Sequence, residues 1–122
     1  MRKYAAPERE FFRLPNSIFS IPMSPYEFRL YAYLVCCCGS RGYCWPTHEK
    51  IMQATGLKKT TLQKAISDLK RRQLISVRKH RNPYGYANNE YHLLPLDNPE
   101  IYRDLEEVTE ELPLFVGENI SA

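Results

Sequence analysis

Two short stretches of the chain are rich in side chains that can bind a polyanion. Residues 58–64 read KKTTLQK, and residues 78–81 read RKHR. Lysine, arginine and threonine side chains donate hydrogen bonds to phosphate oxygens, and glutamine can pair with the edge of an adenine base. The chemistry that these residue types support is therefore non-covalent recognition of phosphates and base edges.

The other reactive residues do not support a catalytic role. The three histidines, His48, His80 and His92, have no nucleophile and orienting acid at a recognisable spacing. With only five glycines, the chain also lacks a phosphate-binding loop of the GxxxxGK type. We therefore expect no enzymatic activity and no cofactor.

The four cysteines are Cys36, Cys37, Cys38 and Cys44, and three of them are consecutive. This clustering cannot form the spaced disulfide framework of small secreted domains, so we expect reduced thiols that pack as small apolar groups at a helix end. A metal site would combine Cys36 or Cys38 with Cys44 and His48. Because the chain has no CxxC and no second ligand pair, we predict no bound metal.

The formal charge of +3 hides an uneven distribution along the chain. Residues 1–96 contain 16 of the 17 lysines and arginines and six acids, which gives +10. Residues 97–122 contain one arginine and eight acids, which gives −7. Clustered cations gain free energy by releasing counterions from phosphates, so the first part favours a polyanionic partner.

We expect a cytoplasmic protein without membrane contact, because no apolar run reaches roughly 18 residues and the N-terminus lacks a signal-peptide pattern.

An arm and a first helix are predicted before residue 43. Residues 1–23 predict an extended arm, because prolines interrupt an otherwise apolar segment. The first helix begins after Ser24, which forms a capping box with Glu27, and ends at the glycines of residues 39–42. Its apolar face, at three-to-four spacing, consists of Phe28, Tyr31, Leu34 or Val35, and Cys38.

Two further helices are predicted on either side of a glycine turn. A β-prone piece, residues 43–45, comes before the second helix, which Thr47 caps and Gly56 ends. The third helix runs from Lys58 or Lys59 to about residue 72, with one apolar face and one basic and polar face.

A β-hairpin follows the third helix. Residues 74–80 and 88–94 read as two strands, joined by the turn formers of the segment RNPYGYA. Alternate residues of a strand point to opposite faces, so Arg78 and His80 share one side. Lys79 and Arg81 then share the other side.

Two helices joined by a tight turn with glycine form the skeleton of the helix-turn-helix. Residues 47–75 resemble the bacterial winged-helix pattern, and residues 14–94 are similar to helix-turn-helix proteins of bacteriophages, plasmids and integrative elements, including replication initiators and replisome organisers. The residues that carry the pattern are Ile51, Met52, Gly56, Lys58, Thr61, Leu62, Gln73, Leu74 and Ile75. The resemblance implies an α+β fold: a winged helix-turn-helix of three helices and a β-hairpin wing over residues 24–96, with an N-terminal arm and a C-terminal acidic helix.

Three residues depart from the family pattern. Met52 replaces a small residue where the helices cross, Lys58 replaces a serine cap, and Gln73 replaces a glycine. Loss of a side-chain cap costs about 1 kcal/mol of stability. Gln73 either takes a left-handed backbone conformation or ends the helix in another way.

The resemblance implies that the third helix enters the major groove of DNA and that the hairpin wing contacts the backbone or the minor groove. Gln63 and Lys64 suit contacts to bases, whereas the other cations and threonines suit phosphates. Tyr86 and Tyr91 suit packing as well as contact. The predicted DNA contacts are Thr47, His48, Lys58, Lys59, Thr60, Thr61, Gln63, Lys64, Arg78, Lys79, Arg81 and Tyr84.

Within the acidic tail of residues 97–122, residues 97–112 combine acids with apolar residues at helical spacing, which predicts an amphipathic helix. This helix would pack on the domain, pair with a second copy to form a homodimer, or solvate the chain. Its acids would also compete with DNA for the basic face. The apolar residues are Ile101, Leu105, Val108 and Leu112.

Residues 111–115, ELPLF, resemble the segment through which bacterial replication proteins dock on the sliding clamp. Leu112, Leu114 and Phe115 would be its apolar anchor. Glu111 stands where the family has glutamine. The alternative is that these apolar side chains pack against the winged helix.

The sequence therefore predicts a protein that binds double-stranded DNA, as a transcription regulator or as a replication initiation factor of a phage, plasmid or integrative element. The alternative is a winged-helix protein-interaction module that has lost DNA binding and docks through its acidic tail. The +10 charge of residues 1–96 favours DNA.

Overall fold

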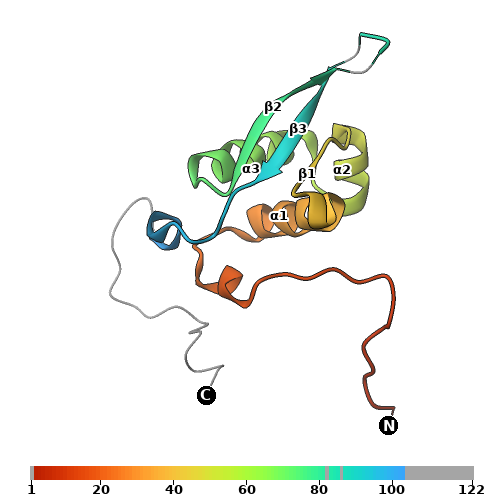
Figure 1. Ribbon diagram of the computed structural model, residues 1–122, viewed down its shortest axis with the longest axis vertical. Helices are drawn as coiled ribbons and strands as arrows, with labels where there is room; N and C mark the ends of the chain where they lie inside the picture. Colours follow the sequence, from red (N-terminus) through yellow and green to blue (C-terminus); the bar gives the residue numbers. More distant parts are fainter. Residues whose placement is uncertain (1, 82, 86, 104–122) are drawn as a thin grey trace.

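Helices and a small antiparallel sheet make up the fold, which is of the predicted α+β class. The computed structural model describes residues 2–81, 83–85 and 87–103 (Figure 1). The α-helices are α1 (Pro25–Cys38), α2 (His48–Thr55) and α3 (Lys59–Arg71). The strands pair in the order β1-β3-β2 and are β1 (Tyr43–Cys44), β2 (Ile75–Arg81) and β3 (Ala87–Leu93). The short 3₁₀ helices are η1 (Asn16–Ser20), η2 (Gly39–Arg41) and η3 (Pro99–Tyr102). Within these described residues, no helix is long and apolar enough to cross a membrane.

The predicted limits of α1 are confirmed. The Ser24 hydroxyl accepts a hydrogen bond from the backbone N–H of Glu27, and the Glu27 carboxylate accepts one from the backbone N–H of Ser24. At the other end, Gly39 has φ 55 and bonds back to the carbonyl of Val35. The buried side differs slightly from the expected one, because Leu30 is fully buried while Phe28 and Val35 are only half-buried.

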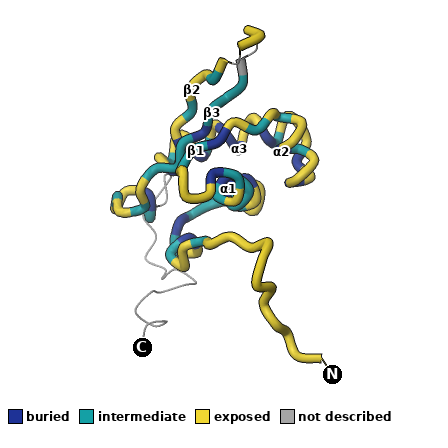
Figure 2. Tube along the Cα trace, turned by 45° about the vertical axis from the view of Figure 1, so that its right-hand side comes forward, coloured by how far each residue is buried: buried dark blue, intermediate teal, exposed yellow. Residues whose placement is uncertain are grey.

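The core lies between the helices and the inner face of the sheet, where the buried positions of Figure 2 gather. Leu30 and Leu34 of α1 meet the buried stripe of α3, and Ile75 and Tyr91 bring the hairpin to the same core. The hairpin then extends beyond the layer of helices (Figure 1). Its root is therefore anchored by apolar burial, and its tip, at Arg81 and residues 83–85, is exposed to solvent.

The N-terminal arm is not extended throughout. Residues 2–13 are exposed and lack regular helix or strand, but η1 follows, beginning after Pro15 (Figure 2). This turn buries Ile18 and Ile21 in the core. Burial of two isoleucine side chains, each favourable by about 1.5 to 3 kcal/mol, explains why the chain folds back here although its prolines predicted extended backbone.

The turn between α2 and α3 is held by local and tertiary hydrogen bonds. Gly56 has φ 75 and closes α2, as predicted, and Thr47 caps the start of α2. The Thr55 hydroxyl donates to the carbonyl of Ile51 and accepts from the N–H of Leu57. Arg29 Nε donates to the Thr55 carbonyl, which ties the turn to α1.

Gln73 adopts the left-handed conformation that was one of the two expected outcomes. Its φ is 63, a region that costs a non-glycine residue about 1 to 2 kcal/mol. The N–H of Leu74 bonds to the carbonyl of Leu69, so Leu74 completes the helix end and β2 starts at Ile75, one residue later than predicted. The Gln73 side-chain oxygen accepts from Asn98 Nδ2 at 2.7 Å.

Only the first part of the predicted C-terminal acidic helix falls within the described residues. There the chain forms the single 3₁₀ turn η3, which buries Ile101 in the core. The predicted helical positions Leu105, Val108 and Leu112, and the segment of residues 111–115, lie outside the described residues.

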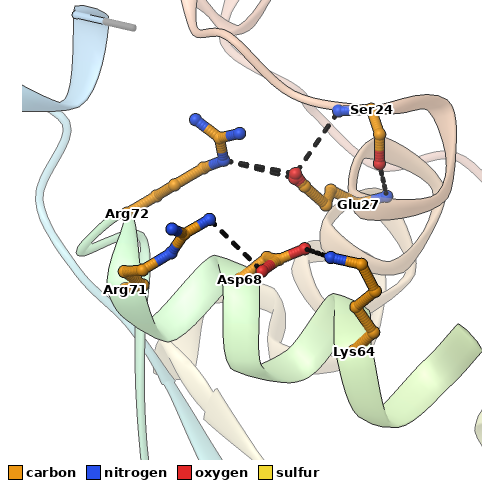
Figure 3. Close-up of polar contacts among 6 residues, drawn as sticks. All are labelled: Ser24, Glu27, Lys64, Asp68, Arg71 and Arg72. Carbon is orange, nitrogen blue, oxygen red and sulfur yellow. Dashed lines mark hydrogen bonds and ion pairs between the residues drawn. The ribbon is translucent and has the colours of Figure 1, made fainter. Parts of the chain in front are cut away.

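A nearly buried ion pair joins the start of α1 to the end of α3 (Figure 3). Arg72 Nε lies 3.2 Å from each carboxylate oxygen of Glu27. The Glu27 side chain is 3% exposed and that of Arg72 is 16% exposed. Glu27 was expected only as a capping residue, and its carboxylate is in fact shared between the cap and this long-range contact.

We predict that Glu27→Gln lowers the free energy of unfolding by about 3 kcal/mol, because it leaves the Arg72 guanidinium without a counter-charge. This loss is at the lower end of the range of about 3 to 5 kcal/mol for removing one partner of a buried ion pair, since Arg72 retains some contact with water. Urea denaturation measures the loss. The control is Glu49→Gln, an exposed carboxylate in the first turn of α2, which should cost less than about 1 kcal/mol. Equal losses in the two variants would contradict a stabilising role for the ion pair.

Candidate nucleic-acid interface

The outward face of α3 presents most of the predicted contacts of this helix. Its inner side is fixed by the burial of Leu62, Ala65, Ile66 and Leu69. Thr61 is half-buried and turns toward α1, where it lines a hollow of about 300 Å³ with Lys64 and Arg71. The exposed residues of the predicted set at α3 are Lys58, Lys59, Thr60, Gln63 and Lys64.

One acid interrupts the basic face of α3. Asp68 binds Lys64 Nζ at 3.2 Å and Arg71 Nη2 at 3.4 Å (Figure 3). Such surface pairs contribute between about 0 and 1 kcal/mol, so a phosphate can replace the carboxylate as partner of either cation. Asp68 is four residues after Lys64, and this i,i+4 spacing was the signal in the sequence that would have identified the pair.

The inner face of the hairpin is connected to the start of α2. Lys79 Nζ on β2 donates to Asn89 Oδ1 on β3 at 3.2 Å. Asn89 Nδ2 lies 3.3 Å from His48 Nε2 and donates to the Tyr91 hydroxyl at 3.2 Å. Asn89 therefore joins the wing to the start of α2 through side-chain hydrogen bonds, and it was not among the predicted site residues.

The donors and acceptors around Asn89 determine its orientation. A lysine ammonium only donates hydrogen bonds, so the amide oxygen of Asn89 must face Lys79. The amide nitrogen then faces His48 Nε2, 3.3 Å away at the entrance of α2.

Three predicted contacts from two elements meet beside this amide. Thr47 and His48, at the start of α2, and Lys79, on β2, line a hollow of about 170 Å³ together with Asn88 and Asn89. A helix start with free backbone N–H groups and a nearby lysine suit a phosphate oxygen. The structure therefore groups Thr47, His48 and Lys79 as one polar site.

Arg78 points to the other face of the hairpin, as the strand alternation predicted. There Glu90 binds three partners: Arg78 Nε at 3.3 Å, His80 Nδ1 at 3.0 Å and His92 Nε2 at 2.7 Å. Arg78 therefore lies on the opposite face of the hairpin from Lys79 and is paired with Glu90, and its contact with DNA stays a prediction. Hydrogen bonds from His92 and His80 hold the pKa of Glu90 below its ordinary value.

Stacked rings cover the same outer face toward β1. Trp45 stacks on His80 with ring centroids 4.6 Å apart, and Tyr43 stacks on Trp45 at 5.9 Å. The Arg41 guanidinium lies over both rings, 4.9 Å from the Trp45 centroid and 5.2 Å from that of Tyr43. At an exposed position each such cation–π contact contributes about 0.5 to 1 kcal/mol.

The tip of the hairpin carries the remaining predicted contacts. Arg81 is exposed, and no ion pair holds it within residues 2–81, 83–85 and 87–103. Tyr84 is 85% exposed at the turn. Tyr86 lies outside the described residues, whereas Tyr91 is fully buried and packs in the core.

The cysteines pack largely as expected at the end of α1. Cys38 and Cys44 are buried with their sulfurs 3.1 Å apart, Cys37 is half-buried and Cys36 is exposed, and all four are free thiols. In the part of the chain that the structure describes, no group of three or more His, Cys, Asp or Glu side chains is arranged to hold a metal ion.

Residues 23–75 match the model of a family described as a helix-turn-helix domain. The match runs from just before α1 to the first residue of β2, so it includes all three α-helices and the glycine turn between α2 and α3. No curated protein and no solved structure gives a significant match. Over these residues the chain matches a helix-turn-helix domain, and its three-stranded sheet is consistent with the winged form of that domain.

We predict that acid weakens the fold partly through Glu90. Because the folded protein lowers the pKa of this carboxyl from 4.5, its ionised form stabilises the fold above that pH, and the contribution is lost as the pH falls through the lowered pKa. The urea midpoint of the protein should therefore exceed that of Glu90→Gln above pH 4.5, with a gap that closes below it. Glu8→Gln, an exposed carboxylate in the arm, is the control. A gap that stays constant between about pH 6 and about pH 3 would rule this out.

Proposed function

We propose that this protein binds double-stranded DNA, with α3 in the major groove and the β2–β3 hairpin against the neighbouring backbone. The observation that carries the proposal is the combination of a helix-turn-helix domain with an exposed polar and cationic stripe on its second helix. The Lys79–Asn89–His48 contacts add support, because they join the wing to the helix-turn-helix. Cations from both elements can then bind one duplex together.

The proposed roles differ along the interface. Lys58 and Lys59 stand at the N-terminus of α3, where the helix dipole adds to their attraction for a phosphate. Gln63 is exposed one turn further along, at a position from which it can pair with an adenine edge. Lys64 exchanges Asp68 for a phosphate or a guanine edge.

We predict that Gln63→Ala and Lys64→Ala each weaken binding to a preferred duplex by about 1 to 3 kcal/mol and relax the preference at one base position. The duplex is first selected from a random DNA pool, and fluorescence anisotropy then measures the affinities. Lys3→Ala removes a cation from the exposed arm and serves as the control, with affinity near that of the parent. Parent-like binding by both α3 variants would exclude α3 as the recognition helix.

We predict that the two arginines of the hairpin differ. Arg81→Ala should reduce the slope of log affinity against log salt concentration by about one, because a phosphate contact is lost. Arg78→Ala removes the same charge but takes it from the Glu90 cluster on the outer face, so its slope should remain close to that of the parent. Salt titrations of both variants on one duplex measure the difference. Equal slopes for the two variants would show that the inner face of the wing has no special contact with DNA.

A protein-interaction module without DNA binding is the competing function. A protein with this function should elute from a DNA column at the salt concentration expected from its net charge alone. Selection from a random DNA pool should then enrich no sequence. Enrichment of one sequence, or of two half-sites related by symmetry, supports the DNA-binding proposal instead.

The finer role depends on residues 97–122, which we propose as a docking or pairing segment on the strength of their sequence. Symmetric half-sites together with a concentration-dependent dimer would support pairing through this segment. Binding of a peptide of residues 107–119 to a purified sliding clamp, with loss of binding on Phe115→Ala, would support a replication role. Absence of clamp binding would favour transcription regulation.

A further inference from the structure

A second hollow, of about 420 Å³, opens beside the site formed by Thr47, His48 and Lys79. Its walls come from the second half of α1, from η2, from β1 and the segment that leads to α2, from the start of α2, and from β3. Their main side chains are Tyr33, Arg41, Trp45, Lys50 and Asn88. The volume falls within the range of roughly 300 to 1,000 Å³ that is typical of small-molecule sites.

The charge of this hollow is one-sided. Arg41 and Lys50 line it, and its described lining contains no aspartate or glutamate. Both side chains are exposed, and neither makes an ion pair in the part of the chain that the structure describes. Lys64, Arg71 and Arg78, in contrast, each make a surface ion pair with a carboxylate. The hollow therefore favours an anionic ligand.

The rest of the wall consists of two aromatic side chains, the neutral polar side chains of Thr47 and Asn88, and Cys37, Cys44 and Pro46. Trp45 is the single tryptophan of the chain and is 36% exposed. Burial and a hydrogen bond with Cys37 raise the pKa of Tyr33 to about 12, so its phenol stays protonated at neutral pH. The Asn88 amide adds both a donor and an acceptor. A flat ring that also bears hydrogen-bonding groups fits such a lining.

Arg41 covers the Trp45 ring and can be displaced. An exposed cation over an aromatic ring is held weakly, whereas a nucleobase stacked on a tryptophan is held more strongly. A base that takes the place of the guanidinium over Trp45 leaves Arg41 free to bind the phosphate of the same nucleotide. One movement thus exposes the ring and supplies the counter-charge.

We propose that this hollow binds a nucleotide whose base is unpaired, with the base on Trp45 and the phosphate between Arg41 and Lys50. The inference does not depend on duplex binding by α3, since Arg41, Trp45 and Lys50 are not part of that interface. The ligand is either a nucleotide within a single strand or a free nucleotide, and these two sources share the chemistry of base and phosphate.

The fluorescence of Trp45 tests the proposal directly, because no other tryptophan contributes to the signal. The full chain is titrated with an oligothymidylate of about 12 nucleotides, with thymidine 5′-monophosphate, and with an abasic strand of the same length. We expect the oligothymidylate to quench the emission and the abasic strand to leave it unchanged. If thymidine monophosphate and the oligothymidylate quench at similar concentrations of nucleotide, the hollow is a free-nucleotide site. If only the oligothymidylate quenches, it is a single-strand site.

Arg41→Ala and Lys50→Ala should each weaken the binding of the ligand that quenches Trp45 by about five-fold or more. If the ligand is a strand, each should also reduce the salt slope by about 0.7, as expected for one lost single-strand phosphate contact. Lys70→Ala is the matched control: it removes an exposed cation of α3 that lines neither this hollow nor the proposed duplex interface, so its emission should be quenched like that of the parent. Equal quenching by the abasic strand, no quenching by either thymidine ligand, or parent-like binding by both Arg41→Ala and Lys50→Ala would overturn the proposal.

Discussion

Burial of the inner stripe of α3 is the constraint on which the interface depends. Leu62 and Leu69 are fully buried, and a helix that buries one side must present the opposite side to solvent. The rotation of α3 about its own axis, and hence the exposure of Gln63 and Lys64, follows from this packing. The ion pair of Glu27 with Arg72 then fixes the end of α3 against the start of α1.

The hairpin divides its charged side chains between two faces, and the two faces are used differently. On the inner face Asn89 holds Lys79 toward α2, so that a wing cation and a helix start meet at one place. On the outer face Glu90 gathers Arg78 and two histidines into a closed cluster. Strand alternation alone produces this division, since adjacent cations of β2 cannot share a face.

Carboxylates pair some of the basic residues of this surface and leave others without an ion pair. Asp68 and Glu90 are paired with cations, whereas the hollows beside α2 have no acid in their described lining. The formal charge of residues 1–96 is therefore a poor measure of binding strength by itself. Among the described residues, the exposed cations without an ion pair include Lys58 and Lys59 at the start of α3, Arg81 at the hairpin tip, and Arg41 and Lys50 beside the second hollow.

Local signals in the sequence determined where the elements begin and end. Ser24 with Glu27, and Gly56, act within three or four residues of themselves, because a cap and a left-handed turn need particular residue types at particular positions. Tertiary structure alone decided the partners of Glu27 and Asn89, which lie 45 residues from Arg72 and 41 residues from His48 along the chain. Helical and strand periodicity assigns a side chain to a face, but which distant side chain that face meets depends on how the whole core packs.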